Sequence, residues 1–370
     1  MMKKILAAAI VSAFAAPAFA ATANVDVYGN LGVSVDFINT DAASPADDKL
    51  TRFSSNSSRI GFKGAEDLGG GLSAIWQIEN QINIDGVGTS NAFVGASTFS
   101  SNLRNTFAGL SSKSMGTVLL GIHDTPYKLS AGKIQFWGDT SADYNNIVGN
   151  VQGSTHFDLR TGNTLAYISP KFGGLSGAIA YVEGNEVGNG ALADASAWSA
   201  SVTYDQGPLF LTAAYEKHNN VVGNTAATAT APAVPADDRD AFKLGAGYAF
   251  GNTKLGLIYE KADSASFVAG KVRDRSAWYL NGAHAMGNIV LKAAYGRAGD
   301  LDGVNDTGAD TWSLGADYTL SKRSYLYAYY TATNNDSAGT YGVGQGQGSA
   351  VVPAAGRDPS VLSIGMRHSF

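Results

Sequence analysis

The fold is decided by the stretch VDVYGNLGVSVDF, which runs from Val25 to Phe37. Its odd positions carry apolar residues or glycine, and its even positions are mostly polar. This alternation with period two is typical of a β-strand whose two faces meet different surroundings. The stretch is longer than the usual strand of a soluble domain and is about long enough to cross a bilayer at a tilt.

The same alternation returns along the rest of the chain. It is clear at Trp198–Tyr204, Phe242–Phe250, Ile289–Tyr295 and Trp312–Leu320. Many of these apolar faces carry Trp, Tyr or Phe at an end. Aromatic girdles at the two interfaces of a membrane would produce that placement, whereas a soluble barrel or sandwich would bury its apolar face.

Short and long connections alternate between the expected strands. Seven tight turns rich in Gly, Asn or Asp alternate with eight longer polar segments, which places both chain ends on the short-turn side. The longer segments are 39–52, 83–102, 126–163, 183–196, 218–240, 262–275, 298–310 and 333–359. Short periplasmic turns, long outer loops and an even strand number are typical of outer-membrane barrels. We therefore predict an all-β fold, a sixteen-stranded antiparallel transmembrane β-barrel.

The first twenty residues have the layout of a secretory signal peptide. Met1–Lys4 is a short cationic start, Ile5–Ala16 is an apolar run, and Ala18–Ala20 has small residues where a signal peptidase cuts. The apolar run is too short to span a bilayer, and no later stretch is long and apolar enough to do so as a helix. We expect a signal peptide at residues 1–20 and a single barrel domain at residues 21–370.

The composition excludes several classes of protein. The chain has no Cys, so it is not a disulfide scaffold, and its 45 Gly, 17 Tyr and 15% charged residues do not suit a disordered chain. The net charge is −5 and the basic residues form no cluster in the sequence, which argues against nucleic acid as a partner. The 5 His lie in no nucleophile motif and show no metal-ligand spacing, so we expect no catalytic residue, metal or cofactor.

Three sequence blocks add a family resemblance to this picture. They are SRIGFKG at residues 58–64, EDLGGGL at residues 66–72 and RTGNTLAYISP at residues 160–170. With Val27-Tyr28-Gly29 in the opening strand, these blocks resemble the general diffusion porins of beta-proteobacteria, the group that includes neisserial porins. The resemblance runs from the signal peptide to Phe370 and is weakest in the long loops.

The resemblance implies an outer-membrane channel for passive diffusion of ions and small hydrophilic solutes. It implies a homotrimer surrounded by outer-membrane lipid and lipopolysaccharide and inserted by the outer-membrane assembly machinery. It also implies that the third outer loop, here Pro126–Asn163, folds inward and narrows the pore. This loop is the longest connection in the chain, and a loop of that length needs a functional reason.

The same resemblance, together with strand parity, indicates which residues line the constriction. Ile60 and Phe62 would face lipid, so Arg59 and Lys63 would face water, and Glu79 would do so by the same rule. Opposed rows of charge across a narrow wet gap orient dipolar solutes and bias ion selectivity. The full candidate set is Arg59, Lys63, Glu79, Arg104, Arg160, Asp139 and Asp143.

Two further features bear on assembly and selectivity. Phe370 ends an amphipathic last strand and resembles the signal that the assembly machinery reads. Ile122 stands where many relatives carry Arg, and the missing charge puts strong anion selectivity in doubt. Ion preference therefore stays open.

Two other interpretations of the barrel and one motif remain to be considered. A structural or adhesive barrel would be smaller, with a lumen filled by side chains. A sugar channel would use an aromatic slide, for which Tyr325, Tyr327 and Tyr329 are candidates, although the parity of that strand is ambiguous. An acidic segment at 300–306 is similar to a calcium loop but lacks the closing glutamate.

Overall fold

The computed structural model describes residues 24–43, 48–85, 99–152, 154–155, 157–184, 195–222, 237–268, 271–347 and 350–370. The expected signal peptide at 1–20 lies outside these ranges. Among the described residues, no helix has the length and apolar character needed to cross a membrane.

The strands have the following bounds along the chain: β1 (Asn24–Asn39), β2 (Lys49–Ser55), β3 (Arg59–Gly69), β4 (Leu72–Ile82), β5 (Phe99–Leu103), β6 (Thr106–Ser112), β7 (Gly116–Asp124), β8 (Asn150–Val151), β9 (Ser154–Thr155), β10 (Arg160–Ile168), β11 (Leu175–Glu183), β12 (Ser196–Gln206), β13 (Leu209–Val222), β14 (Asp237–Phe250), β15 (Thr253–Val268), β16 (Lys271–Met286), β17 (Ile289–Ala298), β18 (Ala309–Ser321), β19 (Ser324–Asn335) and β20 (Ser360–Ser369). The helical turns are α3 (Pro126–Leu129), η1 (Tyr144–Asn146) and η2 (Gln345–Gln347).

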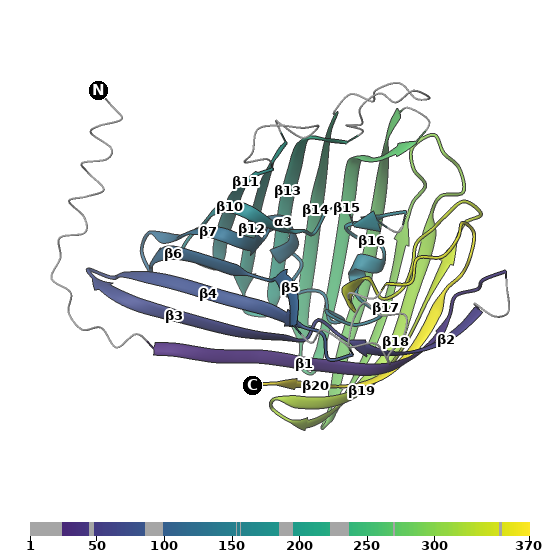
Figure 1. Ribbon diagram of the computed structural model, residues 1–370, viewed down its shortest axis with the longest axis horizontal. Helices are drawn as coiled ribbons and strands as arrows, with labels where there is room; N and C mark the ends of the chain where they lie inside the picture. Colours follow the sequence, from purple (N-terminus) through teal and green to yellow (C-terminus); the bar gives the residue numbers. More distant parts are fainter. Residues whose placement is uncertain are drawn as a thin grey trace.

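The main sheet closes into a barrel (Figure 1). Consecutive spans pair antiparallel, and β1 pairs with β20 from Asn30 to Asn39 to close the ring. β2 and β3 pair with successive halves of β1, and β5 and β6 both pair with β4, so each of these two couples forms one interrupted span. Within the described residues the sheet therefore has sixteen spans, as the sequence predicted.

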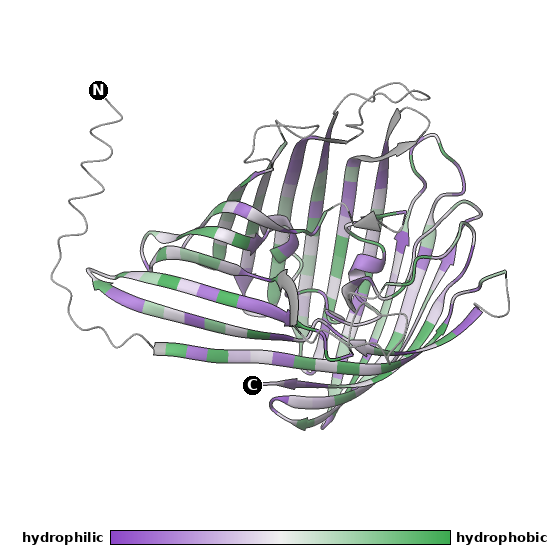
Figure 2. Ribbon diagram, in the orientation of Figure 1, coloured by the Kyte–Doolittle hydropathy of each residue, from purple (hydrophilic) through white to green (hydrophobic). Residues whose placement is uncertain are grey.

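The two faces of the wall differ as the alternation requires. In β1, Val27 and Phe37 are 56% and 48% exposed on the outside, while Asp36 is only 1% exposed on the inside. Figure 2 shows apolar and polar residues alternating along the strands. An outer surface of this kind suits contact with lipid, where polar side chains would be costly.

Several predicted loop boundaries were wrong by a few residues, because strands extend further than expected, as at the ends of β13 and β15. The expected loop 262–275 is mostly a continuation of the β15–β16 hairpin, because pairing extends to Val268 and Lys271. β10 already begins at Arg160, and a register shift between Thr161 and Thr164 accommodates the polar residues expected to lie in the loop. In both places polar residues form ladder hydrogen bonds, so side-chain polarity alone did not mark the strand ends.

The connection between β7 and β10, residues 125–159, is called loop 3 and folds into the barrel. Tyr127 N donates to Ser199 Oγ of β12 at 3.0 Å, Asn281 Nδ2 of β16 donates to Ile134 O at 2.8 Å, and Ser363 Oγ of β20 bonds to Ser141 Oγ at 3.0 Å. Trp137 packs its ring edge-on against Tyr329 at 5.0 Å. Loop 3 thus contacts widely separated strands from inside, and the inner core lies between it and the wall.

Candidate pore constriction

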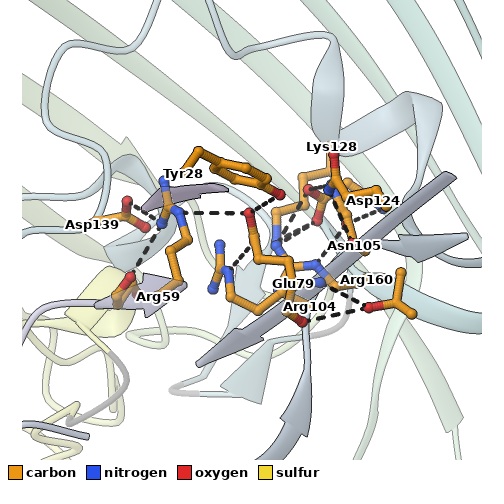
Figure 3. A network of polar contacts seen from close by, with 12 residues as sticks. Tyr28, Arg59, Glu79, Arg104, Asn105, Asp124, Lys128, Asp139 and Arg160 are labelled. Carbon is orange, nitrogen blue, oxygen red and sulfur yellow. Dashed lines mark hydrogen bonds and ion pairs between the residues drawn. The ribbon is translucent and has the colours of Figure 1, made fainter. Parts of the chain in front are cut away.

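Strand parity places the first part of the site. Arg59 opens β3 and faces the lumen, and Glu79 faces it from the neighbouring β4, where Gly61 is its register partner. Arg104 Nε lies 2.7 Å from Glu79 Oε1, and Arg59 Nε lies 3.9 Å from Glu79 Oε2. Tyr28 of β1 donates its hydroxyl to Glu79 Oε2 at 3.0 Å. Figure 3 shows these four side chains meeting around the Glu79 carboxylate.

Loop 3 brings a second acid to this cluster. Asp139 Oδ2 accepts from Arg59 Nη1 at 3.0 Å and from Arg367 Nη2 of β20 at 2.5 Å. Burial alone would raise the pKa of Asp139, but the two guanidinium groups outweigh it and hold this pKa at about 2. Asp139 is therefore ionised across the physiological pH range and ties the loop to two strands of the wall.

A third acid organises the far end of the network. Asp124, at the end of β7, lies 3.0 Å from Arg160 Nη2 and 3.3 Å from Lys128 Nζ of α3. The Asn105 side chain bonds to both of the first two residues: its Oδ1 accepts from Arg160 Nε at 2.9 Å, and its Nδ2 donates to Asp124 Oδ2 at 3.0 Å. Arg104 and Asn105 are neighbours in the chain, so the cluster around Glu79 and the cluster around Asp124 lie side by side, and together they are called the network (Figure 3).

Cations outnumber acids in this network. Each of the three acids contacts two cations, and Arg59 is shared between two of them. The acids are Glu79, Asp124 and Asp139, and the cations are Arg59, Arg104, Arg160, Arg367 and Lys128. Five positive charges against three negative ones give these eight residues a net charge of +2.

Two residues of the predicted set lie apart from the network. Lys63 is exposed, forms no ion pair with another described residue, and places its Nζ 5.2 Å from the centre of the Tyr28 ring. Asp143 is 5% exposed, and its carboxylate accepts from the backbone of loop 3 itself rather than from an arginine. The structure thus brings together Arg59, Glu79, Arg104, Arg160 and Asp139.

Sequence reasoning missed Arg367, Asp124 and Lys128. A signal existed for Arg367, because it alternates with the outward-facing Met366 on the last strand. No such signal marks Lys128, whose place depends on the path of loop 3.

The structure also corrects the interpretation of Ile122. Leu120 of β7 is 61% exposed to the outside, and Ile122 follows it on the same face. His123 faces inward, where its ring packs on Phe107 at 5.3 Å. Ile122 therefore has no bearing on the charge of the lumen.

The tyrosine row of β19 faces inward and is largely covered. Tyr327 and Tyr329 are 5% and 0% exposed, and their rings stack at 4.4 Å. Leu326 and Tyr330 form the outward face. The parity that was ambiguous in the sequence is thereby resolved, and Trp137 of loop 3 packs against the Tyr329 ring.

Comparison with known proteins agrees with this geometry. A family model described as Gram-negative porin matches residues 7–338. Outer membrane porin protein 32 of Delftia acidovorans is 28% identical over 376 residues, and major outer membrane protein P.IB of Neisseria meningitidis serogroup B is 28% identical over 382 residues. Both alignments cover 100% of each chain.

Solved structures show the same fold. The anion-selective porin from Comamonas acidovorans superposes with a TM-score of 0.74 and 25% identity, covering 94% of this chain and 100% of that one. OmpT of Vibrio cholerae in its trimer form superposes with a TM-score of 0.67 and 19% identity, and the superposition covers 94% of this chain and 99% of that one. At this identity the likeness supports the fold alone. The inward-folded loop agrees with the family match: the chain belongs to the Gram-negative porin family and forms a channel through the outer membrane.

Proposed function

We propose that ions and small hydrophilic solutes are selected where Asp139 of loop 3 meets Arg59 and Arg367 of the wall. The observation that carries this proposal is the bridge itself, since one loop carboxylate holds guanidinium groups from two strands. Glu79, Arg104, Arg160, Asp124 and Lys128 extend the charged surface along the same side. Charges fixed on a narrow aqueous passage bias which ions enter it.

The net charge of the network favours anions. A unit charge about 8 Å from a passing ion acts on it with about 0.5 kcal/mol in water, which is close to RT and changes an ion ratio about two- to threefold. The excess of two positive charges therefore supports a moderate anion preference. A similar protein of 25% identity is described as an anion-selective porin, which supports the same direction.

Removing two of the arginines tests this assignment. Purified protein carrying Arg59→Ala with Arg160→Ala is refolded into a planar bilayer, and the reversal potential is recorded across a KCl gradient. Loss of two positive charges should shift the permeability ratio toward K⁺ by about fivefold. Lys322→Ala with Arg323→Ala, at the exposed β18–β19 turn, removes the same charge far from the network and is the matched control. An unchanged reversal potential in the first variant would refute the assigned role of both arginines.

We also propose that three copies assemble in the membrane. The support is the apolar outer face of the wall, part of which neighbouring copies would cover. Outer-membrane lipid and lipopolysaccharide would cover the rest of that face, and the outer-membrane assembly machinery would insert the barrel after reading Phe370. Conductance steps that close in threes would support the trimer, and single independent steps from a monomeric species would oppose it.

A further inference from the structure

Asp143 lies behind the constriction and holds the backbone of Asp139. Asp143 Oδ2 accepts a hydrogen bond from Asp139 N at 3.1 Å, and its Oδ1 accepts one from Asn145 N at 2.9 Å. Asp139 has φ of 58°, in the left-handed region that residues other than glycine seldom adopt. A conformation of this kind persists only where its surroundings fix it. Asp143 is the side chain that bonds the amide at this strained position.

The outer loop before the last strand closes over Asp143 from the other side. This loop, residues 336–359, is called loop 8, and it packs Gly346 directly on the Asp143 side chain: a Cβ at Gly346 would lie 2.6 Å from Asp143 Cγ. Two backbone groups of loop 8 bond to loop 3, because Gly344 N donates to Ser141 O at 3.2 Å and Gln345 N donates to Asn146 Oδ1 at 3.1 Å. Ser57 of the wall donates to Gly346 O at 3.1 Å. Asp143 is thus enclosed between the two loops.

We propose that Asp143 is a positioning residue of the pore, which sets from behind loop 3 where the Asp139 carboxylate meets Arg59 and Arg367, and that loop 8 keeps it in place. The inference rests on the proposed function, because it assigns to Asp143 control over a contact that selects ions. Asp143 itself touches no arginine of the constriction, so its effect on selectivity passes through the backbone of Asp139.

The ionisation of Asp143 supplies a readout that a packing role would not move. Burial raises the pKa of Asp143 to about 7, and the nearby Asp139 adds to the rise, while the two backbone hydrogen bonds and Lys128 oppose it. The other titratable groups close to it are the buried phenols of Tyr144 and Tyr279. Since the pKa in the folded loop is raised above the ordinary value of 3.8, Asp143 contributes stability that is fully present below about pH 4 and is lost by the time the pH has risen through about 7. Below that pH the side chain is neutral but still accepts hydrogen bonds.

The experiment exploits this pH window. At about pH 5.5 Asp143 is mostly neutral and Asp139 is fully ionised, so any effect of Asp143 variants on ion selectivity reflects position rather than lost charge. Reversal potentials in KCl gradients are compared for Asp139→Asn, Asp143→Asn, Asp143→Ala, Gly346→Ala and the parent protein. Gly132→Ala is the matched control, because Gly132 also lies in loop 3 and a Cβ there would meet only Leu129 O, at 3.4 Å.

The proposal predicts a specific pattern. Asp139→Asn should shift selectivity toward Cl⁻ by about twofold. Asp143→Ala and Gly346→Ala should shift it in the same direction by a comparable amount. Asp143→Asn can still accept from Asp139 N through its one amide oxygen, although it loses the bond to Asn145 N, so it and Gly132→Ala should stay close to the parent. The heat-denaturation midpoint of the parent should also fall as the pH rises from about 4 to about 7 and level off above that, and this component should vanish in Asp143→Asn.

The outcomes separate the two levels of inference. If Asp139→Asn shifts selectivity but Asp143→Ala and Gly346→Ala do not, the positioning role is overturned and the constriction stands. If Asp139→Asn has no effect, the proposed function fails at this residue and the positioning role fails with it. If Asp143→Ala does not fold, the comparison of Gly346→Ala with Gly132→Ala tests the positioning role, since neither substitution alters a charge. The role is overturned if these two variants have the same selectivity.

Discussion

Arg104 and Lys63 carry the same charge on the same side of the wall, but their surroundings differ. Arg104 is held 2.7 Å from Glu79 Oε1 with 13% of its side chain exposed, whereas Lys63 is solvent-exposed and lies only beside the Tyr28 ring. A fixed, partly desolvated charge acts more strongly on a passing ion than a mobile and screened one. Arg104→Gln should therefore shift the permeability ratio toward K⁺ about twofold or more, and Lys63→Gln should shift it less. Reversal potentials of the two variants check this, and an equal or larger effect at Lys63 would contradict the geometry.

Each of these residues could be predicted only where a sequence pattern determines the direction of its side chain. Arg59 and Glu79 were predicted because parity along a single strand determines which way they face. Arg367 was open to the same rule but belongs to no family block. Asp143 was expected among the lumen acids, yet its direction depends on the backbone of a long loop, including the left-handed Asp139, which no periodic pattern encodes.

At the scale of elements, loop 3 is anchored by buried charges at its second end. Asp158 pairs with Lys243 of β14, and both side chains are fully buried. Replacing one partner of such a pair leaves an uncompensated buried charge and costs about 3–5 kcal/mol, whereas replacing both is often close to neutral. Lys243→Met should therefore lower the heat-denaturation midpoint strongly, and adding Asp158→Asn should restore much of it. Losses that simply add in the double variant would show that the pair does not anchor the loop.

The same scale shows which elements the sequence could predict. The strands were predictable because lipid outside and water inside impose a period of two on every span. The ends of β15 and β16 at their connection were not, because polar residues lie in a stretch where the ladder continues as far as the pairing of Val268 with Lys271. The breaks within the spans β2–β3 and β5–β6 were also not predicted, because a break in the ladder leaves the alternation on either side intact.

At the scale of the whole molecule, the barrel depends on one non-local pairing between the chain ends. β1 and β20 pair over Asn30–Asn39, and Phe370 extends the pairing through reciprocal backbone bonds with Gly29 at 3.1 and 3.0 Å. The Phe370 ring lies against Gly29, where a Cβ would meet ring atom Cε1 at 2.9 Å. The ring is nevertheless 39% exposed on the outer surface, so it contributes modestly to packing.

This geometry separates a recognition role of Phe370 from a structural one. Phe370→Ala keeps the backbone bonds to Gly29 and loses only a partly exposed ring, so the purified chain should still refold in detergent with a nearly unchanged midpoint. If the assembly machinery reads the terminal aromatic ring, the same variant should reach the outer membrane of living cells at a much lower level than the parent. Leu362→Ala, which removes another outward apolar side chain from β20, is the control and should assemble normally. Failure of Phe370→Ala to refold in detergent would instead make the ring part of the closure of the barrel, because no assembly factor is present there.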